Sequence, residues 1–407
     1  MKKALSIILI LAFVVLIGAV AFRFTLMPSF VSSFQKERTE KVSEAVKIKD
    51  TIKVAGDNYL GYWFITSSEF KQRLAQKGYG VQWTNDGGVY SDRLQKFREG
   101  KYDLIVLPVN SYILHGKPDP YPGVIVAALS DSKGADMIVG YKDKITAENR
   151  PLRVNDLNNP DLRIGATTDS PSSFLLDSAT VFFDLDKIRA KTQRYIGTNS
   201  SEEALKKLSD RQLDVAVLWE PNVSQALQIP GVVSIFGSDQ ISGMIIDVFV
   251  AKNEALISKP EMVNAFFEAY FETLAYYGGN RDEMIGQMAR TTAFKTEDAV
   301  KVALNRIAWF DLNENYNEWF GQKERIIRTI IQVRDVMTDI GELNFDPLSG
   351  NPYKIISSKV LEKVYTKSLP DVWKIGAIVP AATTFSALTD ADWNKLKSVG
   401  TLKTLPI

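Results

Sequence analysis

The chain has 407 residues, of which 49 are Lys or Arg and 48 are Asp or Glu, so its formal net charge at pH 7 is +1. So balanced a charge gives no field that would attract nucleic acid, and we expect no nucleic-acid partner. The chain has no cysteine and a single histidine, His115, which excludes disulfides, thiol nucleophiles and multi-histidine metal centres. The sequence also has no Gly-x-Ser-x-Gly, His-Glu-x-x-His or calcium-loop motif, so we expect no catalytic residue, no metal site and no cofactor. We expect His115 to be solvated in a turn-rich loop.

An apolar segment at the N-terminus predicts export from the cytoplasm. Lys2 and Lys3 precede about 19 mostly apolar residues, from Ala4 to Phe22, and a membrane-spanning helix needs about 20. We favour a retained anchor at residues 1–23 over a cleaved signal, for which Ala19-Val20-Ala21 would be an acceptable cleavage site. In either case the two lysines favour an inside N-terminus and place the rest of the chain in the periplasm or at the cell surface.

Residues 24–50 contain a charge-dense stretch that predicts a stalk or linker. Strands and helices then alternate, which predicts a mostly parallel sheet with helices on its faces. We assign residues 51–130 to the first part of one lobe. The predicted strands are Thr51–Ala55, Val81–Thr84 and Asp103–Leu107, and the predicted helices are Ser68–Lys77 and Ser91–Glu99.

The same alternation restarts further along the chain and predicts a second lobe, at residues 131–245. A return to the first lobe follows at residues 246–366 and is mainly helical. The aromatic stripe of the helix Met262–Tyr277 indicates core packing. The predicted strands are Leu162–Ala166, Gln193–Ile196, Asp214–Leu218, Val232–Phe236 and Ile245–Ala251. The further predicted helices are Pro171–Phe183, Ser201–Leu208, Glu297–Ala308, Gln322–Ile340 and Ile355–Tyr365.

Five motifs occur in a particular order along residues 51–366. They are a glycine-aromatic loop at Gly56–Trp63, the run Gly78-Tyr79-Gly80-Val81, the pair Gly87-Gly88, the step from Leu94 through Gly100 to Asp103, and Leu218-Trp219-Glu220-Pro221. In order and spacing they resemble the nitrate/sulfonate/taurine-type family of ABC-transporter solute-binding proteins, which includes thiamine-precursor-binding members. The resemblance implies a two-lobed α/β fold of the periplasmic-binding-protein type II. It also implies non-catalytic capture of a small, anionic or zwitterionic organic ligand for an ABC permease.

Ligands of parallel α/β lobes bind at the carboxyl ends of the strands, beside helix N-termini. This rule selects the loops that follow the predicted strands. The candidate ligand-binding residues are Asn58, Tyr62, Trp63, Gly88, Val89, Asn110, Ser111, Thr168, Ser170, Ser172, Ser173, Trp219 and Glu220.

Several of these candidates also have a purely structural interpretation. Ser170 and Pro171 predict a capped helix start whose free N–H groups, with the hydroxyls of Ser172 and Ser173, can hold an oxyanion; a plain cap is the alternative. Tyr62 and Trp63 can enclose an organic ligand or pack beneath the first helix. For Glu220, a structural role at the hinge between the lobes competes with binding of a ligand amine or hydroxyl.

Two other functional interpretations remain open at the level of sequence. One is an envelope-tethered interaction or sensing protein that keeps the binding fold without a transport role. The other is an enzyme on the same fold, but the relatives that make thiamine precursor depend on cysteine and histidine residues that this chain lacks. Residues 367–407 form an extension of unknown role, either a terminal strand or the lead-in to a further domain, such as the outer-membrane-protein-A-like module of some relatives.

Overall fold

The computed structural model describes residues 47–369, except 118–119, 147–149, 151, 191–192 and 295. The predicted anchor at residues 1–23 and nearly all of the predicted stalk and C-terminal extension lie outside the described residues. Within the described ranges, no helix combines the length and the apolarity needed to cross a bilayer.

The first lobe is built on a six-stranded sheet with the order β11-β4-β10-β3-β1-β2. Strands β1, β2 and β3 are parallel, whereas β10 runs antiparallel to both β3 and β4. The strand that returns from the second lobe therefore lies in the middle of the first sheet. The strands are β1 (Asp50–Gly56), β2 (Tyr79–Asn85), β3 (Leu104–Pro108), β4 (Gly123–Ser132), β10 (Ile246–Lys252) and β11 (Ile307–Trp309).

Helices cover this sheet, and the longest of them, α13 (Pro260–Gly279), packs its aromatic face on Phe249 of β10. The ring of Phe249 lies 5.1 Å from that of Phe267 and 4.9 Å from that of Tyr270, and all three are fully buried. The aromatic stripe is thus core, as predicted. The other helices are α3 (Trp63–Thr66), α4 (Ser68–Gln76), α5 (Tyr90–Arg98), α6 (Val109–Gly116), α12 (Asn253–Ser258), α14 (Arg281–Thr291), α15 (Glu297–Leu304), α16 (Leu312–Glu314) and α18 (Lys359–Ser368).

The second lobe has a five-stranded sheet with the order β7-β6-β8-β5-β9. Its strands are β5 (Asp136–Tyr141), β6 (Ile164–Thr167), β7 (Ile196–Thr198), β8 (Val215–Trp219) and β9 (Val232–Gly237). Its helices are α7 (Lys142–Ile145), α8 (Pro171–Phe182), α9 (Asp186–Arg189), α10 (Ser201–Ser209) and α11 (Asn222–Ala226).

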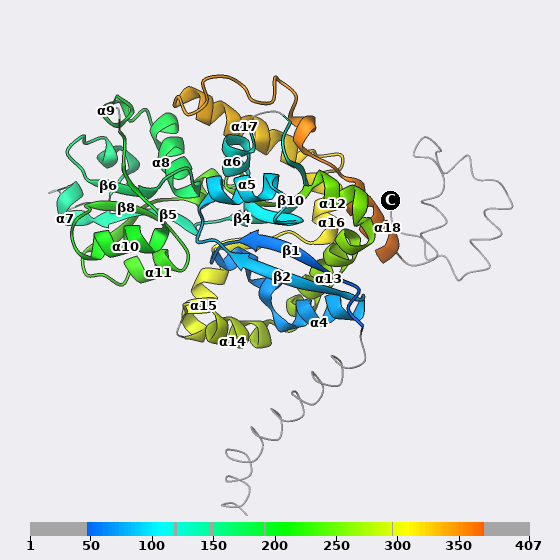
Figure 1. Cartoon of the computed structure of the whole chain (residues 1–407). Helices are drawn as coiled ribbons and strands as arrows, with labels where there is room; N and C mark the ends of the chain where they lie inside the picture. The colour runs from blue at the N-terminus through cyan, green and yellow to red at the C-terminus, as the bar shows by residue number, and fades with distance from the viewer. Residues whose placement is uncertain are drawn as a thin grey trace, which may run out of the picture.

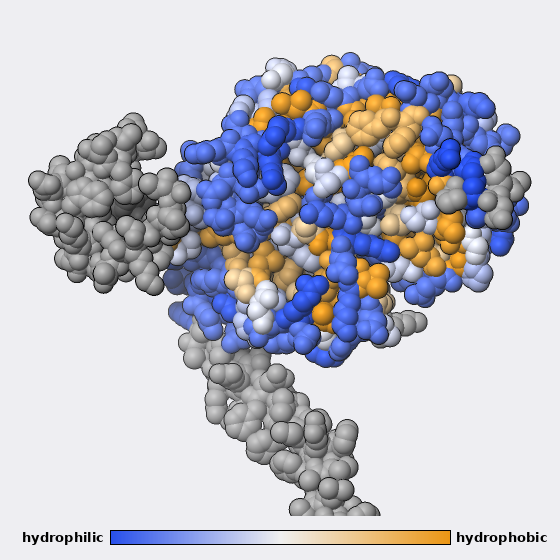
Figure 2. All heavy atoms as spheres, turned by 180° about the vertical axis from the view of Figure 1, so that it is seen from behind, coloured by the Kyte–Doolittle hydropathy of each residue, from blue (hydrophilic) through white to orange (hydrophobic). Residues whose placement is uncertain are grey.

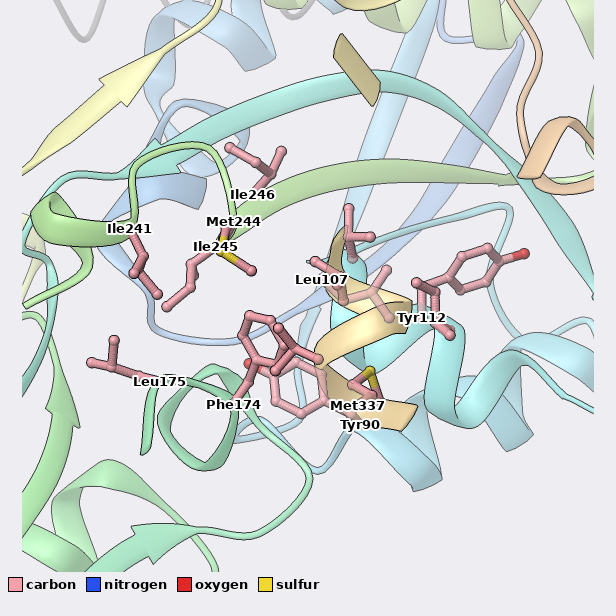
Figure 3. Packing of buried hydrophobic residues seen from close by; sticks show 14 of the residues in the cluster. Tyr90, Leu107, Tyr112, Phe174, Leu175, Ile241, Met244, Ile245, Ile246 and Met337 are labelled. Carbon is pink, nitrogen blue, oxygen red and sulfur yellow. The ribbon is translucent and has the colours of Figure 1, made fainter. Parts of the chain in front are cut away.

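The two lobes lie side by side, with the second sheet to the left of the first in Figure 1. The chain leaves the first sheet after β4, and it returns between β9 and β10. Helix α17 (Arg325–Asp339) packs on α6 of the first lobe and on α8 of the second. Figure 3 shows part of the buried cluster that runs through both lobes, with Tyr90 from α5, Phe174 from α8 and Met337 from α17. The lobes are thus in direct apolar contact.

Three strands were not predicted from the sequence. Strands β4 and β5 are apolar runs without a two-residue alternation, because both are buried on their two faces. The helix predicted over Glu297–Ala308 ends at Leu304, and Ile307–Trp309 instead forms the edge strand β11, which pairs with β4. The strand predicted over Gln193–Ile196 lies at Ile196–Thr198, and the last predicted helix begins at Lys359 because Pro352–Ile355 forms a 3-10 turn.

The surface carries charges of both signs, as the balanced composition implies. On the face shown in Figure 2, apolar side chains reach the surface in scattered patches between hydrophilic ones.

The expectation that His115 is solvated in a loop was wrong. His115 lies in the last turn of α6, its side chain is only 13% exposed, and its Nε2 is 3.8 Å from Asp169 Oδ2.

Candidate ligand-binding cleft

Two cavities lie between the lobes, at the carboxyl ends of β1 and β8. The tyrosine cavity, of about 10 Å³, is lined by Tyr59, Tyr62, Tyr90, Asp136, Pro171, Trp219 and Asp247. The tryptophan cavity, of about 230 Å³, includes Trp63 and Trp83 of the first lobe and Glu202 and Pro221 of the second. Tyr59 and Tyr62 line both cavities, so a molecule bound here would contact both lobes.

A larger cavity, of about 800 Å³, lies within the first lobe between α13 and α18. Three of its charged residues, Lys77, Glu268 and Lys367, are already joined in ion pairs. Because the cavity has no wall from the second lobe, lobe closure would not enclose a molecule there. The cleft between the lobes is therefore the better candidate site.

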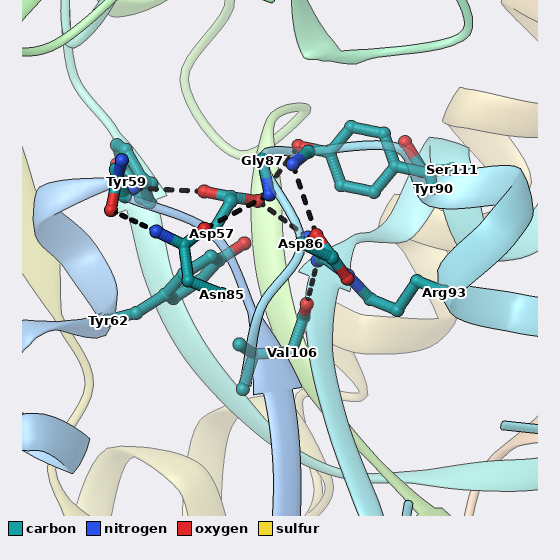
Figure 4. A network of polar contacts seen from close by, with 12 residues as sticks. Asp57, Tyr59, Tyr62, Asn85, Asp86, Gly87, Tyr90, Arg93, Val106 and Ser111 are labelled. Atoms are coloured by element: carbon teal, nitrogen blue, oxygen red, sulfur yellow. Dashed lines mark hydrogen bonds and ion pairs between the residues drawn. The ribbon is translucent and has the colours of Figure 1, made fainter. Parts of the chain in front are cut away.

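A buried charge network forms the first-lobe side of the cleft (Figure 4). Arg93 is completely buried on α5 and donates to Asp57 Oδ2 at 2.9 Å and to Asp86 Oδ1 at 2.5 Å. It also donates to the backbone oxygen of Val106. Burial raises the pKa of Asp57, and the Arg93 guanidinium opposes this shift. Arg93 thus fixes the loops after β1 and β2, and its donors are used within the protein.

A second carboxyl group, that of Asp247 on β10, accepts a short hydrogen bond from the Tyr62 hydroxyl. Ser130 Oγ lies 3.5 Å from its other oxygen. Burial raises the pKa of Asp247 well above its usual value, and the carboxylates of Asp136 and Asp57 raise it further. This pair holds the Tyr62 ring in the wall of both cavities.

The third carboxyl group, Asp136, opens strand β5 in the second lobe beside Trp219 on β8. The residue is only 2% exposed, and its Oδ1 atom has no hydrogen-bond partner. Burial raises the pKa of Asp136 to about 7, against a hydrogen bond with Ser132, and the Asp57 and Glu220 carboxylates add to the increase. An unpartnered buried carboxyl oxygen is costly and calls for a structural or functional reason.

Direct hydrogen bonds between the lobes involve two predicted site residues. Asn110 Nδ2 donates to the Ser170 carbonyl at 3.3 Å, and Ser111 Oγ donates to the Asp169 carbonyl at 3.2 Å. Both donors begin α6 of the first lobe, and both acceptors precede α8 of the second. These residues join the two lobes in this conformation.

The start of α8 has the predicted cap. Ser170 Oγ accepts from Ser172 N at 3.0 Å and donates to the Thr167 carbonyl at 2.7 Å, and Ser173 Oγ completes a capping box. These two hydroxyls are therefore engaged in the cap. Ser172 Oγ is buried without a hydrogen-bond partner, and Thr168 is exposed.

The remaining predicted residues divide between the cavities and the structural framework. Asn58, Tyr62 and Trp63 line the tryptophan cavity, and Trp219 lines the tyrosine cavity. Gly88, at φ +84°, faces the Trp219 ring, since a Cβ there would lie 3.8 Å from it. Glu220 accepts instead from Ser224 and Arg306, and Val89 is the N-cap of α5 and is 44% exposed.

The sequence analysis did not select Arg93, Asp136 or Tyr90. A signal for Arg93 existed, because Tyr90, Arg93, Leu94 and Phe97 share one helical face, and a charge on an apolar face indicates a buried pair. Asp136 could not be found without strand β5. Among the described residues, no three carboxyl or histidine side chains converge as ligands of one metal ion.

Two lobes that enclose a buried polar cleft at their sheet ends define the fold of the periplasmic solute-binding proteins. No protein-family model and no curated protein matches this sequence. Solved structures do match it, and they confirm the resemblance at the level of the fold.

One similar structure is the aliphatic sulphonate binding protein SsuA from Escherichia coli, with a TM-score of 0.58 and 15% identity over 75% of this chain and 92% of that one. Another is the nitrate-binding protein NrtA from Synechocystis, with a TM-score of 0.58 and 12% identity over 86% of this chain and 98% of that one. A third is the ligand-binding component of an ABC-type import system from Staphylococcus aureus, with a TM-score of 0.59 and 13% identity over 78% of this chain and 99% of that one. All three are ligand-binding proteins with the same two-lobed architecture.

Proposed function

We propose that this chain is a solute-binding protein that captures a small molecule between its two lobes and delivers it to an ABC-type permease. The observation that carries the proposal is the cleft itself: two cavities with walls from both lobes, beside polar lobe-to-lobe contacts. Capture would proceed by hinge closure, which creates the surface that a permease recognises. The names of the similar structures support the same role.

The proposal includes an extracytoplasmic location and a tether to the cytoplasmic membrane. Support comes from Lys2, Lys3 and the apolar run that follows them. For the ligand, the sequence led us to expect an anionic or zwitterionic organic molecule. The walls of the cleft favour the zwitterion over the simple anion, because several carboxyl groups lie there.

A pair of spin labels tests the capture step. The chain has no cysteine, so Lys101→Cys on the first lobe and Lys206→Cys on the second introduce the only labelling sites. Both positions are exposed. The label-to-label distance is measured by electron spin resonance in the full-length protein in detergent, with and without nitrate, ethanesulfonate, taurine, butylamine or putrescine.

We expect at least one of these solutes to shorten the mean distance or narrow its distribution, since a bound molecule bridges the lobes. Calorimetric titration of the same solutes provides the matching affinity. If no solute binds and no distance changes, the proposed function is refuted for these ligand classes.

A tethered interaction or sensing protein is the second candidate. It is favoured by the small volume of the tyrosine cavity, about 10 Å³, which is the space of about one water molecule. Genes for a permease and an ATPase next to that of this protein would support transport, and their absence would support the second candidate.

A further inference from the structure

The walls of the two cleft cavities have an uneven charge. Among the described residues that line them, four are carboxylic acids, namely Asp57, Asp136, Glu202 and Asp247, and none is Lys, Arg or His. The cavity walls therefore offer acidic acceptors and no basic side chain, which favours a cationic donor over a simple anion.

The nearest guanidinium cannot reverse this charge. Arg93 is the only cation of the network around Asp57, and it is shared between Asp57 and Asp86. Its Nη1 atom bonds the carbonyl of Val106. The Arg93 donors face acceptors within the first lobe, so Asp136 and Asp247 have no cation in the described structure that compensates them directly.

Among these carboxyl groups, that of Asp136 has an oxygen free to accept a hydrogen bond. Its Oδ1 atom is buried in the wall of the tyrosine cavity and has no partner. In contrast, Asp247 already accepts from Tyr62, and Asp57 already accepts from Arg93 and from the Tyr59 N–H group. A donor that enters the cavity would thus complete the one unsatisfied acceptor among the three aspartates.

The other walls of the tyrosine cavity suit a cationic donor. They consist mainly of the rings of Tyr59, Tyr62, Tyr90 and Trp219, and aromatic rings attract a desolvated cation. The Tyr59 hydroxyl is also buried and has no hydrogen-bond partner. Carboxylate, ring and hydroxyl together favour an ammonium group that carries N–H donors.

We infer that the solute of this protein is a small organic amine, whose ammonium group binds Asp136 in the tyrosine cavity. The organic part extends along Tyr59 and Tyr62 into the tryptophan cavity, because these two residues line both spaces. The volumes agree with this division, since about 10 Å³ accommodates one polar group and about 230 Å³ a short chain or ring. The inference rests on the proposed function, and it assigns a cationic ligand in place of the anionic or zwitterionic one expected from the sequence.

The test compares amines with anions on the same protein. Calorimetric titration of the full-length protein uses butylamine and putrescine as amines, and ethanesulfonate and nitrate as anions. We expect one or both amines to bind and to shorten the distance between the labels at positions 101 and 206. Neither anion should bind.

Two variants distinguish the Asp136 carboxylate from buried charge in general. Asp136→Asn should weaken amine binding about ten- to a hundredfold, as expected for the loss of one charge-assisted hydrogen bond. Asp131→Asn is the matched control. Asp131, on β4 of the first lobe, is also buried, but its carboxylate accepts hydrogen bonds from Ser242 and Gly243 and lines neither cavity. The Asp131→Asn variant should change the affinity for the amines by less than about threefold.

The pH dependence provides a second readout. Asp57 faces Asp136 from the loop after β1, Glu220 from the end of β8, and Asp247 from β10. Burial, against a hydrogen bond with Ser132 and with the added charges of Asp57 and Glu220, raises the pKa of Asp136 to about 7. Butylamine stays protonated near neutrality and binds the ionised carboxylate, so its affinity should rise about tenfold from pH 6 to pH 8. Asp136→Asn should flatten this profile.

The results separate the two proposals. If the anions bind and close the lobes while the amines do not, the solute-binding function stands and the amine is ruled out. If the amines bind equally well to the Asp136→Asn variant, the assignment of Asp136 is wrong. If none of the solutes binds and the label distance does not change, the amine assignment fails, and the solute-binding function is refuted for the ligand classes tested.

Discussion

The buried carboxylate of Glu220, at the end of β8, forms an ion pair with Arg306, which lies between α15 and β11. The pair joins the second lobe to the first. Glu220 is completely buried, and Ser224 N and Ser224 Oγ donate to it at 3.1 and 2.8 Å. Every partner of this carboxylate is thus a group of the protein, and its geometry fits a structural role at the hinge.

Arg306→Met should therefore destabilise the protein. The variant leaves a buried carboxylate without its cation, and we expect a loss of about 3 kcal/mol. This is the lower end of the range for a broken buried pair, because Arg306 is partly in contact with water. Urea unfolding measures the loss. Glu220→Gln/Arg306→Met should recover most of it, and Lys206→Met, which breaks an exposed pair, should cost less than about 0.5 kcal/mol. An Arg306→Met protein as stable as the parent would refute this role.

Gly61→Ala should disturb the wall of the cleft. A Cβ at position 61 would lie 2.3 Å from a carbon of the Tyr59 ring and 2.9 Å from Ser130 Oγ. Tyr59 must then move, and we expect a loss of about 1–3 kcal/mol together with weaker solute binding. Gly278→Ala is the matched control, because no atom outside its helix lies within 4 Å of the added Cβ. That variant should be neutral or more stable by up to about 1 kcal/mol.

Tyr62→Phe should destabilise the protein by about 1–3 kcal/mol, because it leaves the buried Asp247 carboxyl group without its hydroxyl donor. The pKa of Asp247, already raised by burial, should rise further, since the Tyr62 hydrogen bond lowers it. Thermal unfolding and NMR titration of a selectively labelled aspartate measure the two effects. Tyr353→Phe removes an exposed hydroxyl that bonds Glu324 and should be close to neutral. An equal loss in both variants would contradict a special role for Tyr62.

The two-lobed fold could be predicted because its signals are local. Glycine residues that end the helices, together with the alternation of strands and helices, indicate β1 to β3 and β6 to β8. The family motifs lie at the turns between these elements. The loops at the strand ends could also be selected, and Tyr62, Trp63 and Trp219 do lie in cavity walls.

The chemistry of the cleft could not be predicted in the same way. It depends on Asp136 and Asp247, which come from antiparallel strands in the two sheets and lie 111 positions apart in the printed sequence. Nothing local indicates that these carboxyl groups share a cavity. The hydroxyls of Ser170 and Ser173 were selected from a local pattern that allowed an anion site. In the structure, both hydroxyls take part in the cap of α8 instead.

Stability should decrease as the pH rises toward 8, because of Glu342. Burial raises the pKa of Glu342 to about 8, and the carboxylates of Asp177 and Asp169 add to the increase, against Arg194. The folded protein thus holds this proton more tightly than the unfolded chain, whose glutamate pKa is 4.5. The contribution of this proton to the free energy of unfolding is complete below pH 4.5 and is lost as the pH rises to about 8. The free energy of unfolding falls by at most about 1.4 kcal/mol per pH unit in this range.

Urea unfolding between pH 6 and pH 8 measures this slope. Glu342→Gln keeps the shape of the side chain without the titration and should reduce the slope. Glu254→Gln changes an exposed carboxylate and should leave the slope as it is. An unchanged slope in Glu342→Gln would show that other groups, such as Asp136, carry the pH dependence.

Closure of the lobes should depend on the two hydrogen bonds at the start of α6. Asn110→Ala/Ser111→Ala removes the donors to the carbonyls of Ser170 and Asp169, and it adds no bulk to the contact. We expect a longer mean distance between labels at positions 101 and 206, because each lost bond favours the open state by about 1 kcal/mol. Ser258→Ala, which removes a hydroxyl bonded within α12, should leave the distance unchanged. If the double variant also keeps the parent distance, the apolar cluster along α17 would have to hold the lobes together by itself.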